Sequence, residues 1–182
     1  MGWVILAIVV VLVLYVVFAY NGLVRGRNQI DNAWSQIDVQ LKRRIDLVPN
    51  LVETVKGYAA HERQTLEAVI AARNSAIAAP QTPQGQALAS DALSGALRQL
   101  FALSEAYPDL KANQNFLALQ EELTATEGRV AYARQFYNDS VLSYNNRLHV
   151  FPTVVIGRMF GFSQREYFQT DDASREVPKV QF

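Results

Sequence analysis

The sequence predicts an all-α protein, in which an N-terminal transmembrane helix precedes an antiparallel helical bundle with long helices. Three observations lead to this fold class. The nineteen residues from Gly2 to Tyr20 contain no charge and no Ser, Thr, Asn or Gln. The apolar residues that follow recur about every 3.6 positions, which is the period of an amphipathic helix. No segment shows the alternating pattern of a strand.

The apolar run is long enough to cross a membrane. As a helix it extends about 28 Å, close to the hydrocarbon thickness of a bilayer. Arginines follow the run and none precedes it, so the positive-inside bias predicts an outer amino terminus and a cytoplasmic bundle. We expect aromatic residues at both ends and the two arginines to hold the anchor at the interfaces: Trp3, Tyr15, Phe18, Tyr20, Arg25 and Arg27.

A cleaved signal peptide is the alternative to an anchor, and Val17, Phe18 and Ala19 resemble a cleavage site. A signal peptide has a basic amino-terminal region and a shorter apolar core, and this sequence has neither. The sequence therefore favours an uncleaved anchor.

The first helix after the anchor carries a stripe from Ile30 that continues in phase past Pro49 and resumes from Leu66 to Ile77. This predicts one continuous helix with a kink, in which Pro49 removes the hydrogen bond to Ile45. The composition of residues 78–85 predicts a linker.

A second helix is predicted over residues 86–106, with these residues on its apolar face: Leu88, Ala92, Leu93, Ala96, Leu97, Leu100 and Leu103. Asn113 is the predicted N-cap of a third helix that continues to the approach to Pro152. Its stripe contains Phe116, Leu119, Leu123, Thr126, Val130, Ala133, Tyr137, Val141, Tyr144 and Leu148. A short helix over residues 153–160, closed by Gly161, and an extended tail complete the chain. The predicted domains are an anchor (1–22), a bundle (23–162) and a tail (163–182).

Helix lengths raise the question of what covers the stripe next to the anchor. The first helix would extend about 80 Å and the second only about 30 Å. The uncovered part would pack either against the carboxyl-terminal segment of the same chain or against a neighbouring subunit. We favour a homo-oligomer that associates through Ile30, Trp34, Ile37, Leu41 and Ile45.

No residue pattern indicates catalysis, a metal site or a cofactor. His61 and Glu62 start like a zinc motif, but Thr65 stands where the second His belongs, and His149 is far along the chain. Zero net charge implies no nucleic-acid partner, and no small-molecule substrate is indicated.

Two further motifs, a basic cluster and a pair of Tyr-Asn dipeptides, are interpreted as structural features. Lys42, Arg43 and Arg44 lie too far from the bilayer for headgroup contact, and the spacing of Lys42 from Asp38 predicts a solvated, paired face. Tyr137 and Tyr144 are seven residues apart on the stripe, each followed by Asn. They form either a polar ladder that fixes register or, as we favour, buried rings flanked by exposed Asn.

Several motifs resemble those of the LemA family of bacterial membrane proteins. They are Ala33–Tyr58, Tyr107–Asn113, Asn115–Phe116, Leu119–Leu123, the Tyr-Asn pairs, Gly161–Phe162, Tyr167–Phe168 and Val177–Val180. The resemblance implies a short outer amino terminus, one anchor helix and a cytoplasmic helical bundle in the inner membrane. It implies no activity.

Three functions are compatible with these patterns. The favoured hypothesis is a non-catalytic, oligomeric scaffold or interaction protein at the cytoplasmic face of the membrane, with the bilayer, its own copies and other membrane proteins as partners. The alternative is a membrane-shaping or lipid-organising protein. A membrane-linked enzyme, using His61, Glu62 or His149, is less favoured because no site is clustered.

Overall fold

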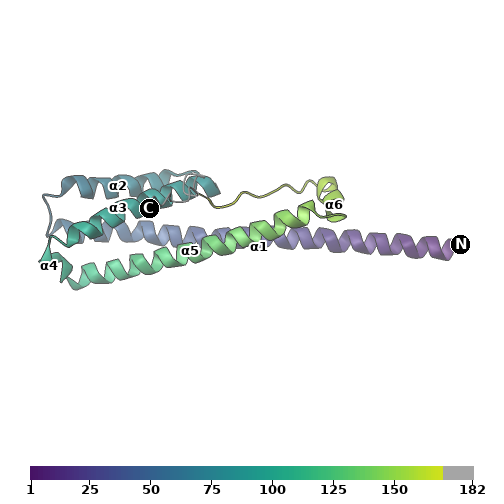
Figure 1. Cartoon of the computed structure of the whole chain (residues 1–182), viewed down its shortest axis with the longest axis horizontal. Helices are drawn as coiled ribbons and strands as arrows, with labels where there is room; N and C mark the ends of the chain where they lie inside the picture. Colours follow the sequence, from purple (N-terminus) through teal and green to yellow (C-terminus); the bar gives the residue numbers. More distant parts are fainter. Residues whose placement is uncertain (170–182) are drawn as a thin grey trace, which may run out of the picture. The chain divides into compact units, whose positions relative to one another are not determined.

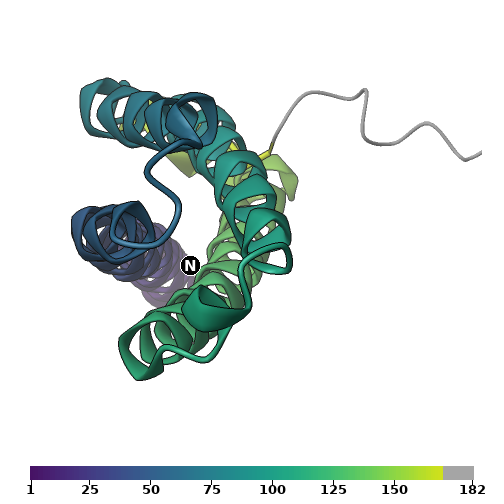
Figure 2. The same cartoon turned by 90° about the vertical axis from the view of Figure 1, so that its left-hand side faces the viewer.

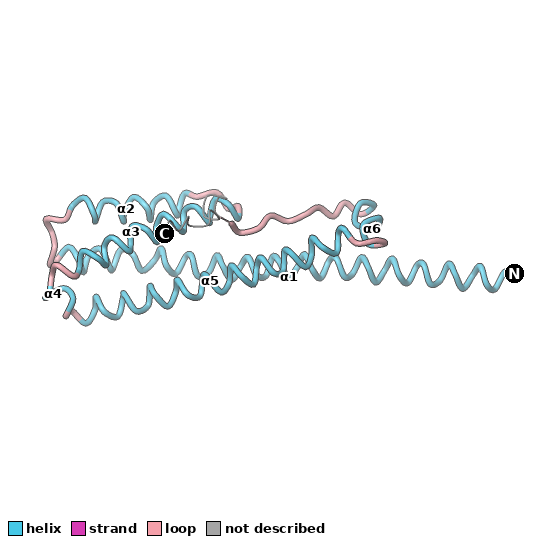
Figure 3. Tube along the Cα trace, in the orientation of Figure 1, coloured by secondary structure: helices cyan, strands magenta, loops and turns pink. Residues whose placement is uncertain are grey.

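The computed structural model describes residues 1–169, and in that part every regular element is a helix (Figures 1 and 3). The elements are α1 (Gly2–Lys56), α2 (Arg63–Ala78), α3 (Pro83–Ser104), α4 (Pro108–Lys111), α5 (Gln114–His149) and α6 (Thr153–Met159). The all-α prediction is confirmed. The predicted tail begins without regular structure over residues 163–169, and its remainder lies outside the described residues.

The chain packs as two compact units, and α1 and α5 contribute residues to both. We call residues 1–37 with 133–167 the anchor unit, and residues 38–132 with 168–169 the core unit. This division is by packing, so the predicted boundaries of anchor, bundle and tail stay predictions.

The prediction of one continuous helix to Ile77 is half correct. The helix α1 passes through Pro49 unbroken, as predicted, but it ends at Lys56, and α2 begins only at Arg63. Gly57 follows the last residue of α1, and glycine is a poor helix former. Leu66 and Val69 of α2 are buried in the same cluster as Val55 of α1, so the chain has to reverse between them.

Pro49 has no N–H, so the carbonyl of Ile45 loses its partner within α1. The Nε atom of Arg73 in α2 donates a hydrogen bond to this carbonyl oxygen at 3.1 Å. The defect that the proline creates is therefore satisfied from a second helix. The same bond ties α2 to α1 at a fixed position along the core unit.

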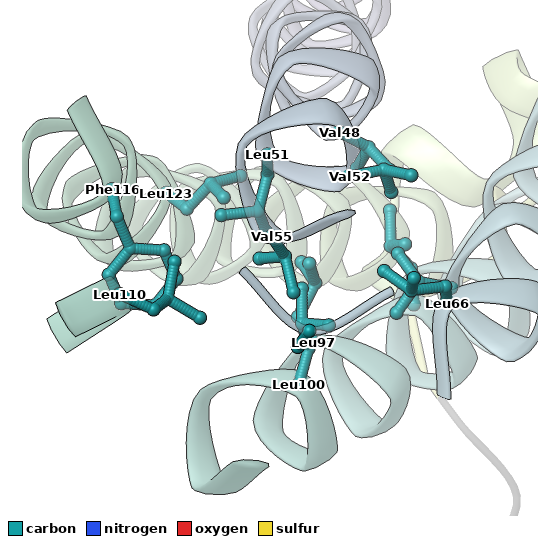
Figure 4. Close-up of a cluster of buried hydrophobic side chains, with 13 residues drawn as sticks. Val48, Leu51, Val52, Val55, Leu66, Leu97, Leu100, Leu110, Phe116 and Leu123 are labelled. Atoms are coloured by element: carbon teal, nitrogen blue, oxygen red, sulfur yellow. The ribbon is translucent and has the colours of Figure 1, made fainter. Parts of the chain in front are cut away.

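The core unit is built around one hydrophobic cluster. In an end view, α1, α2, α3 and α5 surround a common interior (Figure 2). Leu51 and Val55 of α1 face Leu97 and Leu100 of α3, and Leu66 of α2 closes one side of the cluster (Figure 4). Leu110, Phe116 and Leu123 of α4 and α5 close the other side.

Polar side chains cap α3 and α5 at their amino ends. Thr82 accepts a hydrogen bond from the Gly85 N–H at 3.2 Å at the start of α3. Asn113 accepts one from the Phe116 N–H at 3.0 Å, which confirms it as the N-cap of α5. The predicted face of α3 is partly wrong, because Leu88 and Ala92 are exposed and the buried face includes Gln86, Ser90 and Ser94 instead.

Much of the stripe next to the anchor is covered within the chain, which was the alternative to the association of copies that we favoured. Ile30, Ile37 and Leu41 are buried, and Ile45 packs against the core cluster. Within the anchor unit, the ring of Trp34 lies 5.7 Å from that of Tyr137 in α5.

The length of α5 explains why the chain itself can cover this stripe. The helix α5 has 36 residues, as many as α1 has after Tyr20. The expectation compared α1 only with the shorter α3, and it took α1 to be longer than it is. Three of the five stripe residues are buried within the single chain, and Trp34 and Ile45 are partly buried. The helix lengths therefore no longer require that a neighbouring copy covers this stripe.

The sequence predicts that the basic cluster of α1, Lys42 to Arg44, is solvated. The structure confirms this for only part of the cluster. Lys42 pairs with Asp38 at 2.7 Å as predicted, and Arg43 pairs with Glu122. Arg44, however, is only 2% exposed, and its guanidinium lies 3.6 Å from the carboxylate of Glu127. Burial lowers the pKa of Arg44, and the charge of Glu127 counteracts this.

A double-mutant cycle tests the bond between Arg73 and the Ile45 carbonyl. Arg73→Ala should lower the free energy of unfolding by about 1–2 kcal/mol, because it leaves a partly buried carbonyl unsatisfied. In a Pro49→Ala background the loss should shrink, because the alanine supplies the missing N–H. Denaturant titrations of the four proteins measure this coupling. An equal loss in both backgrounds would contradict this role of Arg73.

Two neighbouring positions of α1 test whether the stripe belongs to the core of one chain. Ile37 is 0% exposed and Val39 is 58% exposed. Ile37→Asp should greatly reduce thermal stability because it buries a charge, whereas Val39→Asp should change stability by no more than about 0.5 kcal/mol. Circular dichroism melts in detergent compare both variants with the wild type. A folded Ile37→Asp protein that melts like the wild type would show that Ile37 faces something other than the chain's own core.

Candidate functional site

The anchor unit contains a groove beside α1, where the apolar run ends. Its volume is about 520 Å³, and residues from α1, α5 and the start of α6 line it. The lining includes Tyr15, Phe18, Gly22, Arg25, Arg147 and Thr153. The hydroxyl groups of Tyr15 and Thr153 lie 3.4 Å apart, which joins α6 to α1 at one end of the groove.

Two glycines of α1 shape this groove. At Gly26 an added Cβ would lie 3.1 Å from Cδ2 of Tyr144, so a side chain there would require the Tyr144 ring to move by a few tenths of an ångström. At Gly22 an added Cβ would meet nothing within 4 Å. The close approach at Gly26 therefore gives way to open space one helical turn earlier, and Phe18 lies one further turn before it.

The predicted anchor residues divide into two groups. Tyr15, Phe18 and Arg25 line the groove. Tyr20 instead makes edge-on ring contacts with Phe160 at 5.0 Å and Phe162 at 5.6 Å. Arg27 lies over the ring of Phe162, 5.7 Å from its centroid, which is within cation–π range.

Trp3 lies near the other end of the apolar run and is 85% exposed. It borders a shallow apolar hollow along the first three turns of α1, with Val4, Ile8 and Leu12. An interfacial position for Trp3 and the other aromatic residues stays a prediction.

The groove combines two chemical environments. Phe18, Ala19 and Leu23 supply apolar surface, and Arg25 and Arg147 supply two guanidinium groups. None of the lining residues is Asp or Glu. Such a site fits a negatively charged group that is attached to an apolar chain, because guanidinium groups bind phosphate with two parallel hydrogen bonds.

The start of the tail is fixed to α5 by side chains that bond to its backbone. Asn145 donates to the carbonyl of Arg165 at 2.9 Å and accepts from its N–H at 3.0 Å. The hydroxyl of Tyr137 donates to the carbonyl of Glu166 at 2.9 Å. Burial raises the pKa of the Tyr137 hydroxyl. The side chain of Arg165 pairs with Asp31 of α1.

These contacts correct one expectation about the Tyr-Asn pairs. The rings of Tyr137 and Tyr144 are buried, as we favoured, but Asn145 is buried as well and was expected to be exposed. Its amide can pair with both polar groups of one backbone residue, so it replaces the partners that an extended segment would find in a sheet.

The remaining candidate residues lie apart from this groove. His61 is exposed in the turn between α1 and α2, and Glu62 accepts a hydrogen bond from the Tyr107 hydroxyl at 2.9 Å. That bond raises the pKa of Tyr107. The ring of His149 contacts the side chain of Gln164. Within residues 1–169, no group of three His, Cys, Asp or Glu side chains is placed to hold a metal ion.

Sequence reasoning missed Arg147, Thr153 and Asn145 as members of this region. They come from segments more than 100 residues after the groove-lining part of α1, and only the packing of α5 and α6 brings them there. The signal that points to this packing is the spacing of Ala19, Gly22 and Gly26, because small residues at three- and four-residue intervals allow helices to approach closely.

Comparisons with known proteins show several relatives. Protein LemA of Metamycoplasma hominis is 28% identical, over 85% of this chain and 71% of that protein. Magnetosome protein MamQ 2 of Paramagnetospirillum magneticum is 25% identical, over 91% of this chain and 70% of that protein. Magnetosome protein MamQ of Magnetospirillum gryphiswaldense is 26% identical, over 85% of this chain and 66% of that protein.

The sequence model of the LemA family matches residues 33–182, which is most of the chain. Among residues 1–169, α1 is the one helix that is long and apolar enough to cross a membrane. The relatives and this helix together indicate a membrane-anchored protein. The chain belongs to the LemA family.

Proposed function

We propose that this protein is a membrane-anchored helical scaffold, which presents its bundle at the cytoplasmic face of a bacterial inner membrane and acts by binding other molecules, without catalysis. The observation that carries the proposal is the continuity of α1. One unbroken helix supplies the apolar run from Gly2 to Tyr20 and also the core residues Val48, Leu51 and Val55.

This continuity matters because no linker separates the apolar run from the residues that pack the core. A flexible linker between span and domain would only tether a domain to the bilayer. Here the apolar run instead belongs to a helix that contributes residues to both packed units, which suits a protein whose task is to present surfaces at a membrane.

The charge pattern supports the cytoplasmic orientation. Residues 1–24 contain no charged side chain, and Arg25 and Arg27 follow the run directly. Lys and Arg close to a span stay on the cytoplasmic side. Arg25 lies in the groove with Arg147 of α5, and Arg27 lies over Phe162 in the loop after α6. The positive-inside bias would therefore place this part of the anchor unit on the cytoplasmic side.

Labelling of single cysteines tests this orientation cleanly, because the natural chain has no Cys. Gly2→Cys places a thiol before the span, and Ser75→Cys places one on an exposed position of α2. A membrane-impermeant maleimide should label Gly2→Cys in intact spheroplasts and Ser75→Cys only after lysis. Labelling of Ser75→Cys in intact spheroplasts would place the bundle outside.

We further propose that copies of the chain associate, through surfaces other than the stripe beside the anchor. Ile70 and Ile77 lie seven residues apart on one side of α2 and are 42% and 53% exposed. A second copy that packs on this side would remove apolar surface from water.

Native mass spectrometry of the protein in mild detergent tests association. The wild type should give masses that are multiples of the chain mass, and Ile70→Asp with Ile77→Asp should give the single chain. Val39→Asp serves as an exposed control with the same chemical change. A single-chain mass for the wild type at every detergent-to-protein ratio would contradict the oligomer.

A further inference from the structure

The segment around α6 carries an apolar surface that the fold leaves uncovered. Ile156 and Gly157 form its buried side, and Gly157 packs toward Leu23 and Leu148. In and just before α6, five large apolar residues within eleven positions are each between 49% and 78% exposed, and the ring of one of them, Phe160, also contacts Tyr20: Val150, Phe151, Val155, Met159 and Phe160. Single exposed apolar residues are common, but a group of this density marks a contact surface.

The position of this surface along α1 identifies what it contacts. Thr153 lies at Tyr15, and Phe160 lies at Tyr20. Tyr15 is five residues inside the end of the apolar run, or about 7.5 Å along the helix. If the run spans a bilayer, the segment from Val150 to Phe160 reaches the boundary between headgroups and acyl chains. Interfacial helices bury their apolar side about 5–10 Å deep at that boundary.

The charges near this surface also match a lipid surface. Residues 1–30 and 140–165 contain five arginines and no Asp or Glu. Arg165 is paired with Asp31. Arg25 and Arg147 line the groove next to α6, and Arg158 is an exposed residue of α6 itself. Apolar side chains surrounded by cations are the composition of segments that lie on anionic membranes.

We propose that α6, together with the turn that joins it to α5, forms a second membrane contact. In this contact Phe151, Val155 and Met159 insert into the interfacial layer of the bilayer that α1 spans. This proposal rests on the membrane anchorage of α1. The second contact holds the anchor unit against the lipid surface at two points, so α5 and the tail that it binds have a defined depth relative to the headgroups.

Spin labels on single cysteines measure this depth in the full-length protein. The chain is reconstituted in nanodiscs of phosphatidylcholine and phosphatidylglycerol, with a nitroxide at Phe151→Cys or Met159→Cys. These side chains are 78% and 74% exposed, so the substitutions spare the core. Gln135→Cys, an exposed position earlier on α5, is the water control, and Leu12→Cys in the apolar run is the lipid control.

The ratio of collisions with oxygen to collisions with a water-soluble nickel complex reports the depth. We expect a higher ratio at Phe151 and Met159 than at Gln135, approaching the ratio at Leu12. Ratios equal to that at Gln135 would overturn the second contact and leave the anchor intact. Labels that neither reagent reaches would show that a protein surface covers α6, which also overturns it. A water-like ratio at Leu12 would overturn the anchorage itself, and the second contact with it.

Discussion

The fold depends on the burial of one apolar stripe along α1. From Ile30 to Val55 this helix presents an apolar residue about once per turn, and each needs a neighbour that removes it from water. The helix α5 supplies neighbours along the stripe, with Trp34 against Tyr137 in the anchor unit and Leu51 near Leu123 in the core unit. The hairpin of α2 and α3 completes the core unit only. The length of α5 follows from this requirement.

Pro49 lies within the part of α1 that carries this stripe. A proline in mid-helix normally costs about 3 kcal/mol through a lost hydrogen bond and a steric clash. Here the carbonyl of Ile45, which has no partner within α1, accepts a hydrogen bond from Arg73 of α2. The bond that α1 loses internally is replaced by one between helices. The proline thereby specifies where α2 lies along α1, which hydrophobic contacts alone define less sharply.

Arginines serve different purposes along the chain, and burial distinguishes them. Arg44 is enclosed in the core unit, where the charge of Glu127 counteracts the lowering of its pKa by burial. Arg25 and Arg147 open onto a groove whose lining contains no carboxylate. The first arrangement keeps a charge compatible with a packed interior, and the second leaves two cations able to meet an external anion. The proposed contacts with lipid depend on the second arrangement.

The sequence by itself determined the helical class, the apolar run, the continuity of α1 through Pro49, the cap at Asn113 and the buried stripe of α5. These features depend on neighbours within a few residues, since periodicity, proline chemistry and capping are local. The end of α1 at Lys56, the burial of Arg44 and Asn145, and the cover of the stripe by α5 were decided only by the tertiary structure. Each depends on which segment, tens of residues away in sequence, lies opposite. Local patterns record that an apolar face needs a partner, but only the packed chain decides which partner it finds.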